Sequence, residues 1–142
     1  RGINKKNMQL YIRDNHLEKY VKLKDYIDNP YKIMKQSDIF ILSSRYEGLP
    51  NVLLEAANLK KLIISTKCPT GPGEILSYGK GGIFFKMSDP KDLVKKIKFA
   101  TNNKKEMRKK INFCFRKLKR YDYKENIDKY FHLVKNQLEI NS

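Results

Sequence analysis

Two glutamates, Glu47 and Glu55, are separated by seven residues in the stretch SSRYEGLPNVLLEA. Pro50 lies between them and is favourable in the first turn of a helix, so we expect a helix to begin there. The N–H groups at the start of such a helix are free to bind anions, phosphate above all. These groups belong to Asn51, Val52 and Leu53. With an acid on either side, the pattern predicts a site for a ligand with a phosphate centre and flanking hydroxyls, such as a sugar nucleotide.

A parallel sheet is expected to position these residues. The segments Asp38–Ser43 and Lys61–Thr66 are short, almost continuous apolar runs, which is typical of strands buried on both faces. Glu47 follows the first of them closely, and Gly48 allows the backbone to approach a ligand. In open parallel sheets, ligands bind in the crevice at the carboxyl ends of the strands. Glu47 is therefore expected at the mouth of that crevice, and Glu55 one turn into the helix.

Strands and helices alternate along the rest of the chain. Further strands are expected at 19–26 and 82–86. Helices are expected at 4–15, 29–36, 51–59, 74–78, from 91 onwards, and at 104–120 and 123–139. The last two have apolar residues at steps of three and four, as amphipathic helices do. This order predicts an α/β domain with a parallel sheet.

The 142 residues, of which 40% are hydrophobic, suffice for one domain with a core over 1–142. No apolar run is long enough to span a membrane and no signal peptide is recognisable. Cys68 and Cys114 have no metal-type spacing and are expected to be buried, reduced thiols, which favours a cytoplasmic protein. His16 and His132 are single histidines with expected surface or packing roles.

The net charge is +16, and residues 91–142 contain 16 Lys and Arg against 6 Asp and Glu. Anionic membrane and nucleic acid are therefore both possible partners, chiefly through residues 104–120. Two plainer interpretations remain open. The basic residues can form a solvated helix face, or reflect a general bias of the sequence towards Lys and Asn.

The stretch SSRYEGLPNVLLEA also resembles the signature of family-4 glycosyltransferases, retaining enzymes of the GT-B fold that use nucleotide-sugar donors. A second stretch, STKCPTGPGEIL at 65–76, resembles members that build bacterial surface polysaccharides and lipid-linked oligosaccharides. The resemblance covers roughly residues 1–100. It implies a Rossmann-like sheet flanked by helices, the C-terminal donor-binding half of a longer two-domain enzyme. Residues 101–142 would be extra C-terminal helices.

The resemblance also implies roles for single residues. Glu47 would be catalytic and would bind hydroxyls of the donor sugar, while Glu55 would bind the ribose. The backbone of the intervening turn would hold the diphosphate, and the loop after the first expected strand would lie near the base. These two groups are Gly48, Leu49, Pro50, Asn51 and Val52, and Tyr26 and Ile27.

The expected reaction is retaining transfer from a nucleotide sugar, with UDP as the expected nucleotide and no metal cofactor. The acceptor would be a growing glycan or a lipid-linked molecule, at the inner face of the cell membrane or in the cytoplasm. The Arg/Lys pair that contacts the diphosphate in this family is not found here. Without the N-terminal acceptor domain, the chain alone is expected to bind a donor weakly and to transfer nothing.

Other interpretations remain open. Glu47 can be a solvated loop acid, Glu55 a favourable charge near a helix start, and Glu74 a cap of the short helix that follows. The Gly71–Gly73 segment is better explained as a turn than as a phosphate loop. A domain that binds sugar nucleotides without transferring sugar is a further alternative. Lys60 replaces the glycine usual at this helix end, so we expect that end to be built differently.

Overall fold

The computed structural model describes residues 4–140, and the side chains of residues 4–138. The chain divides into two compact units, residues 1–32 and residues 33–142. The first unit contains helix α1 (Lys5–Asp14), as predicted. Near its start, Lys5 forms an ion pair with Asp25 over 2.5 Å. This hydrogen bond and the charge of Lys5 lower the pKa of the Asp25 carboxyl.

The strand predicted at 19–26 is absent from the described structure, so that prediction is wrong. The residues after α1 follow a turn and then an irregular path as far as α2 (Tyr31–Gln36). Alternating apolar residues form a strand only where a neighbouring strand supplies hydrogen-bond partners. No strand of the described sheet pairs with this segment, and Tyr20 and Tyr26 are exposed.

The second unit is built on a parallel sheet, as predicted. Its strands are β1 (Ile39–Leu42), β2 (Leu62–Thr66) and β3 (Ile83–Phe85), in the order β1-β2-β3. In the register, Ile64 of β2 lies opposite Ile41 of β1 and Ile83 of β3. All five residues of β2 are buried, which explains the continuous apolar run in the sequence.

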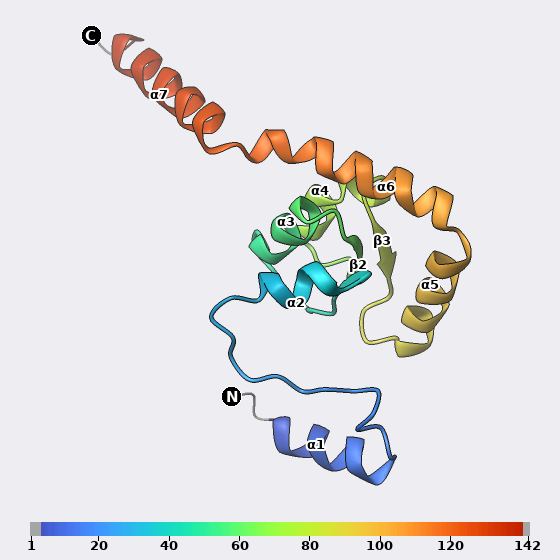
Figure 1. Ribbon diagram of the computed structural model, residues 1–142. Coiled ribbons are helices and arrows are strands. Elements are labelled where there is room, and N and C mark those ends of the chain that lie inside the picture. Colours follow the sequence, from blue (N-terminus) through green and yellow to red (C-terminus); the bar gives the residue numbers. More distant parts are fainter. Residues whose placement is uncertain (1–3, 141–142) are drawn as a thin grey trace. The chain divides into compact units, whose positions relative to one another are not determined.

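Helices follow each strand (Figure 1). After β1 comes α3 (Asn51–Asn58), and after β2 come α4 (Pro72–Ile75) and the 3₁₀ turn η1 (Ser77–Gly79). After β3 come α5 (Pro90–Asn102), α6 (Lys104–Lys117), η2 (Leu118–Tyr121) and α7 (Tyr123–Ile140). The Asp89 carboxylate caps α5 by accepting from the Asp92 N–H over 2.9 Å.

The two faces of β2 pack against different sets of residues. Ile63 packs in a cluster with Leu53 and Ala56 of α3. Leu62 and Ile64, on the opposite face, pack with residues of α5 and α6, among them Met107. Alternate residues of a strand point to opposite faces, so this division follows directly from the pleat.

The end of α3 departs from our expectation. Lys60 adopts the left-handed conformation, with φ 52°, at the place where glycine is usual. The N–H groups of Lys60 and Lys61 donate to the carbonyls of Ala57 and Ala56, which is the Schellman arrangement. The Lys60 ammonium lies 4.5 Å from the centre of the Phe115 ring in α6, and this contact offsets part of the backbone cost.

Helix α7 is amphipathic, yet its apolar side is exposed. Phe131 is 67% exposed and Leu138 is 68% exposed. No helix within residues 4–140 has the length and apolar content needed to cross a membrane.

Candidate functional site

The loop after β1 is held by the end of β2. The carbonyl of Ser44 accepts two hydrogen bonds, from the Thr66 hydroxyl over 2.5 Å and from the Cys68 thiol over 3.1 Å. Thr66 and Cys68 are both buried. The loop that carries Glu47 is therefore fixed to the neighbouring strand at its first turn.

A second pair of contacts joins this loop to the segment before α4. The Thr70 hydroxyl donates to the backbone carbonyl of Glu47. Gly71 has a φ of 84°, and a Cβ atom there would lie 2.1 Å from the carbonyl oxygen of Gly48. Only glycine fits this approach, because any side chain would push the two backbones apart. Gly71 therefore supports the loop that carries Glu47. The turn predicted at 71–73 is only partly correct, because α4 already begins at Pro72.

The start of α3 presents free backbone donors. Pro50 occupies the N-cap position with extended backbone, and no side chain caps the helix. The Leu53 N–H donates to the Pro50 carbonyl over 2.9 Å, so our prediction that it is free for a ligand is wrong. Within the described residues, the N–H groups of Asn51 and Val52 have no acceptor. Two donors, backed by the helix dipole, are thus available to an anion.

Glu55 lies one turn further along α3. Asn51 and Asn58 are exposed and Glu55 is half-buried, while Leu53, Ala56 and Ala57 face the core. Residues four and three apart lie on one face of a helix, so Glu55 shares the open face with Asn51. Glu47 is half-buried, in the loop just before the helix. The two acids therefore belong to the two segments that adjoin the free N–H groups.

Leu49 is 53% exposed beside these groups, and Gly48 is exposed as well. Tyr26 and Ile27 belong to the first unit, where Tyr26 is 84% exposed. Their role at the nucleobase stays a prediction, as do the ligand contacts of the other candidate residues. No three His, Cys, Asp or Glu side chains gather as metal ligands in the described part of the chain.

Sequence reasoning missed the residues that brace the site. Thr66 and Thr70 carry no charge, and the sequence analysis includes them only as part of the stretch STKCPTGPGEIL. Their hydroxyls nevertheless hold the loop that carries Glu47. Arg120 was assigned to the basic stretch, but its guanidinium donates to the carbonyls of Glu74 and Ile75, the latter over 3.0 Å. It thus closes the end of α4. No local pattern marks the two threonines, because their hydroxyls bond to carbonyls 22 and 23 residues away in the sequence.

Glu74 is exposed. Tyr121 lies close enough to Glu74 and Arg120 for both to affect the pKa of its hydroxyl. Burial raises the pKa of the Tyr121 hydroxyl, with a smaller opposing effect from the Arg120 charge. Burial likewise raises the pKa of the Cys114 thiol. Both cysteines are buried and free, as predicted.

Residues 1–113 match the family model described as glycosyl transferases group 1. The chain belongs to this family. The loops at the carboxyl ends of β1 and β2, which carry the two glutamates and the contact of Gly71 with Gly48, lie within the matched residues.

Curated relatives agree with this assignment. The chain is 40% identical over 98 residues to the uncharacterized glycosyltransferase MJ1059 of Methanocaldococcus jannaschii, covering 60% of this chain and 24% of that protein. It is 26% identical over 114 residues to the O-antigen biosynthesis glycosyltransferase WclY of Escherichia coli, covering 80% and 31%. The chain spans between a fifth and a third of the length of these relatives.

Solved structures show the same fold. Anabaena HepE in complex with UDP superposes with a TM-score of 0.83 at 17% identity, over 92% of this chain and 36% of that one. Staphylococcus aureus TarM superposes with a TM-score of 0.80 at 23% identity, over 93% and 27%. The predicted fold, the C-terminal part of a GT-B glycosyltransferase, is confirmed.

Proposed function

We propose that this chain is the donor-binding half of a retaining glycosyltransferase in polysaccharide biosynthesis. It would take the sugar from a UDP-sugar and pass it to a growing glycan or a lipid-linked acceptor. One observation carries the proposal. The free N–H groups of Asn51 and Val52 start a helix at the carboxyl edge of the sheet, with Glu47 before them and Glu55 after them.

The site suits the charges of this reaction. When the bond between sugar and nucleotide breaks, negative charge grows on the diphosphate. Fixed N–H dipoles at the start of α3 stabilise that charge without having to reorganise. The carboxylate of Glu47 would accept hydrogen bonds from the sugar and that of Glu55 from the ribose. Thr70 and Gly71 hold the backbone of this loop, so the groups are aligned before the donor arrives.

Similar proteins support a proposal for the donor and the acceptor. HepE and the pneumococcal transferase GtfA were both solved with UDP. A relative from Staphylococcus aureus is a poly(ribitol-phosphate) N-acetylglucosaminyltransferase, and one from Campylobacter jejuni acts on a diphospho-undecaprenol glycan. We therefore propose a UDP-sugar donor and an acceptor that is a surface polymer or its lipid-linked precursor.

The test is a titration of the chain with UDP, GDP and ADP, followed by calorimetry or NMR shifts. We expect UDP to bind, and Glu55→Ala to weaken it about tenfold or more, because a hydrogen bond to a charged group contributes about 1.5–3 kcal/mol. Asp128→Ala, which removes an exposed acid from α7, is the matched control and should leave binding unchanged. Equal binding of UDP by wild type and Glu55→Ala would contradict the proposal.

A second titration separates the two glutamates. Glu47→Ala should leave the affinity for UDP unchanged, because its carboxylate is proposed to contact only the sugar. The same variant should lose the additional affinity that a matching UDP-sugar has over UDP. If Glu47→Ala instead weakens UDP as strongly as Glu55→Ala does, the assignment of the sugar to Glu47 is wrong.

A further inference from the structure

Helix α6 carries a large excess of positive charge. Between Lys104 and Lys117 the sequence has seven Lys and Arg and one acid, Glu106. The ion pairs of the described residues join Lys5 to Asp25, Arg13 to Asp14 and Lys119 to Glu125, so none involves a cation of α6. This charge is therefore not neutralised within the part of the chain that the structure describes.

The cations are ordered along the helix. Met107 and Cys114 are buried on the side that packs on the sheet. On the opposite side, residues at steps of four, three and four form one exposed line: Lys105, Lys109, Asn112 and Arg116. The line holds three cations, one amide and no acid.

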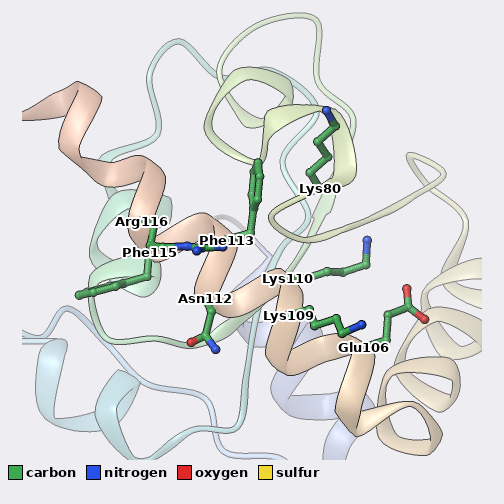
Figure 2. A pocket seen from close by; sticks show the side chains of 8 residues that line it. All are labelled: Lys80, Glu106, Lys109, Lys110, Asn112, Phe113, Phe115 and Arg116. Atoms are coloured by element: carbon green, nitrogen blue, oxygen red, sulfur yellow. The ribbon is translucent and has the colours of Figure 1, made fainter.

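A surface hollow of about 650 Å³ lies beside this line. None of the residues that line it belongs to the loops that carry Glu47 and Thr70. Figure 2 shows the side chains around it, with four cationic groups and the single carboxylate of Glu106. The cationic residues are Lys80, Lys109, Lys110 and Arg116. Lys110 donates to the Gly79 carbonyl over 2.7 Å, which ties α6 to the loop that carries Lys80.

An ammonium group lies over each of the two aromatic rings on α6. Lys60 lies 4.5 Å from the centre of the Phe115 ring, and Lys117 lies 5.8 Å from that of Phe113. Stacking of unpaired nucleobases requires open aromatic faces. Here the rings hold ammonium groups near the protein surface. This arrangement favours binding to the phosphate head groups of a lipid bilayer over binding to a nucleic-acid strand.

We propose that the outer side of α6, together with Lys80, is a docking surface for an anionic lipid bilayer. Basic residues near such a surface are attracted by its negative potential, and their contributions add within a Debye length. The apolar side of α6 stays packed on the sheet, so the helix adheres by charge and does not insert. This inference is independent of the proposed donor chemistry.

The experiment is co-flotation of the chain with vesicles of phosphatidylcholine, with and without phosphatidylglycerol. The test variant is the triple Lys105→Gln, Lys109→Gln, Arg116→Gln. The control is the triple Lys91→Gln, Lys95→Gln, Lys98→Gln, which removes the same charge from one exposed side of α5. All six side chains are exposed, so circular dichroism should show both variants folded.

We expect binding to phosphatidylglycerol vesicles that weakens as salt rises. Each cation removed from α6 should lower the partition coefficient about fivefold, and the triple variant about a hundredfold. The α5 triple should stay within a few-fold of wild type. Equal losses in the two triples would show an effect of net charge alone and overturn the proposal.

Two other outcomes would also overturn it. Equal, salt-insensitive binding to vesicles without phosphatidylglycerol would show apolar adhesion, for which the exposed side of α7 is the candidate. Binding of a single-stranded oligonucleotide that depends on the α6 cations, with no binding to anionic vesicles, would assign the surface to nucleic acid.

Discussion

The loops at the carboxyl end of the sheet and helix α7 are held in opposite ways. The loop at 43–50 is joined to the end of β2 by three side-chain hydrogen bonds and by the approach of Gly71 to Gly48. Helix α7 contacts η2, its neighbour in sequence, while Phe131 and Leu138 on its apolar side are exposed. The irregular loop at 43–50 is thus held by more contacts to distant parts of the chain than the regular helix α7. Such long-range contacts, and not regular secondary structure, fix a segment in place.

The largest expected effect is that of Gly71→Ala. The new methyl would overlap the Gly48 carbonyl at 2.1 Å and place a side chain at φ 84°. Overpacking costs about 1–3 kcal/mol and the positive φ about 1–2 kcal/mol. We expect a loss of about 4 kcal/mol in the free energy of unfolding, measured in urea, and loss of UDP binding.

Gly73→Ala is the control for this variant. Gly73 lies in α4, two residues further on, and its Cβ would find ordinary van der Waals contact at 3.5 Å. Alanine is favoured over glycine inside a helix, so this variant should be as stable as wild type or slightly more stable. If the two variants were equally stable, the contact of Gly71 with Gly48 would not hold the loop at 43–50, and the contrast between this loop and α7 would be wrong.

A pair of truncations tests the boundary between the packed helices and α7. Met107 in α6 is 4% exposed and packs on β2, whereas Phe131 in α7 is 67% exposed. Met107→Ala should lower the free energy of unfolding by about 2–3 kcal/mol, since it leaves a cavity. Phe131→Ala should change it by less than about 0.5 kcal/mol, as surface substitutions do. A large cost for Phe131→Ala would mean that α7 is packed in solution.

How much of this could be predicted depends on the kind of contact. Glu47, Pro50 and Glu55 lie within nine residues, and the buried strands on either side of α3 are apolar runs, so the sequence predicts this arrangement. The bond from Thr70 to Glu47 joins residues 23 apart, and its existence depends on the path of two loops. Periodicity correctly predicted helix α7, but it contains no information on a partner. The alternation at 19–26 failed for the same reason.

The hydrogen bond of the Thr70 hydroxyl tests, at a single contact, how firmly the loop at 43–50 is held. Thr70→Val keeps the shape of the side chain but cannot donate to the Glu47 carbonyl. We expect UDP affinity to fall about three- to tenfold, because a neutral hydrogen bond contributes about 0.5–1.5 kcal/mol. Thr70→Ser restores the hydroxyl and should restore affinity. If serine does no better than valine, the hydroxyl does not support the loop.

Lys60 offers a smaller effect at the other end of α3. Lys60→Gly removes the cost of a left-handed lysine, about 1 kcal/mol, and also the contact with Phe115, about 0.5–1 kcal/mol. The two changes nearly cancel, so we expect the free energy of unfolding to move by less than about 0.5 kcal/mol. Lys60→Ala keeps the cost and loses the contact, and should be less stable than Lys60→Gly in thermal melts. The reverse order would contradict this account.

The smallest effect concerns pH. Burial raises the pKa of Cys114 above its ordinary value of 9.0, so the folded state holds this proton more tightly than the unfolded state. The resulting stabilisation is present below pH 9 and is lost as the pH rises towards the folded-state pKa. Urea midpoints should therefore fall above pH 9, and less steeply in Cys114→Ala. Identical slopes would show that other groups cause the alkaline loss.

The two faces of β2 also fix an order of events during synthesis. Ile63 can meet Leu53 and Ala56 as soon as β2 has left the ribosome, because α3 precedes it. Ile64, on the other face, must wait for Met107, 43 residues later by their positions in the chain. Until α5 and α6 have both emerged, this apolar face of the central strand is incompletely covered and open to solvent, chaperones or another nascent chain. Ribosome pausing within that interval would lengthen the exposure.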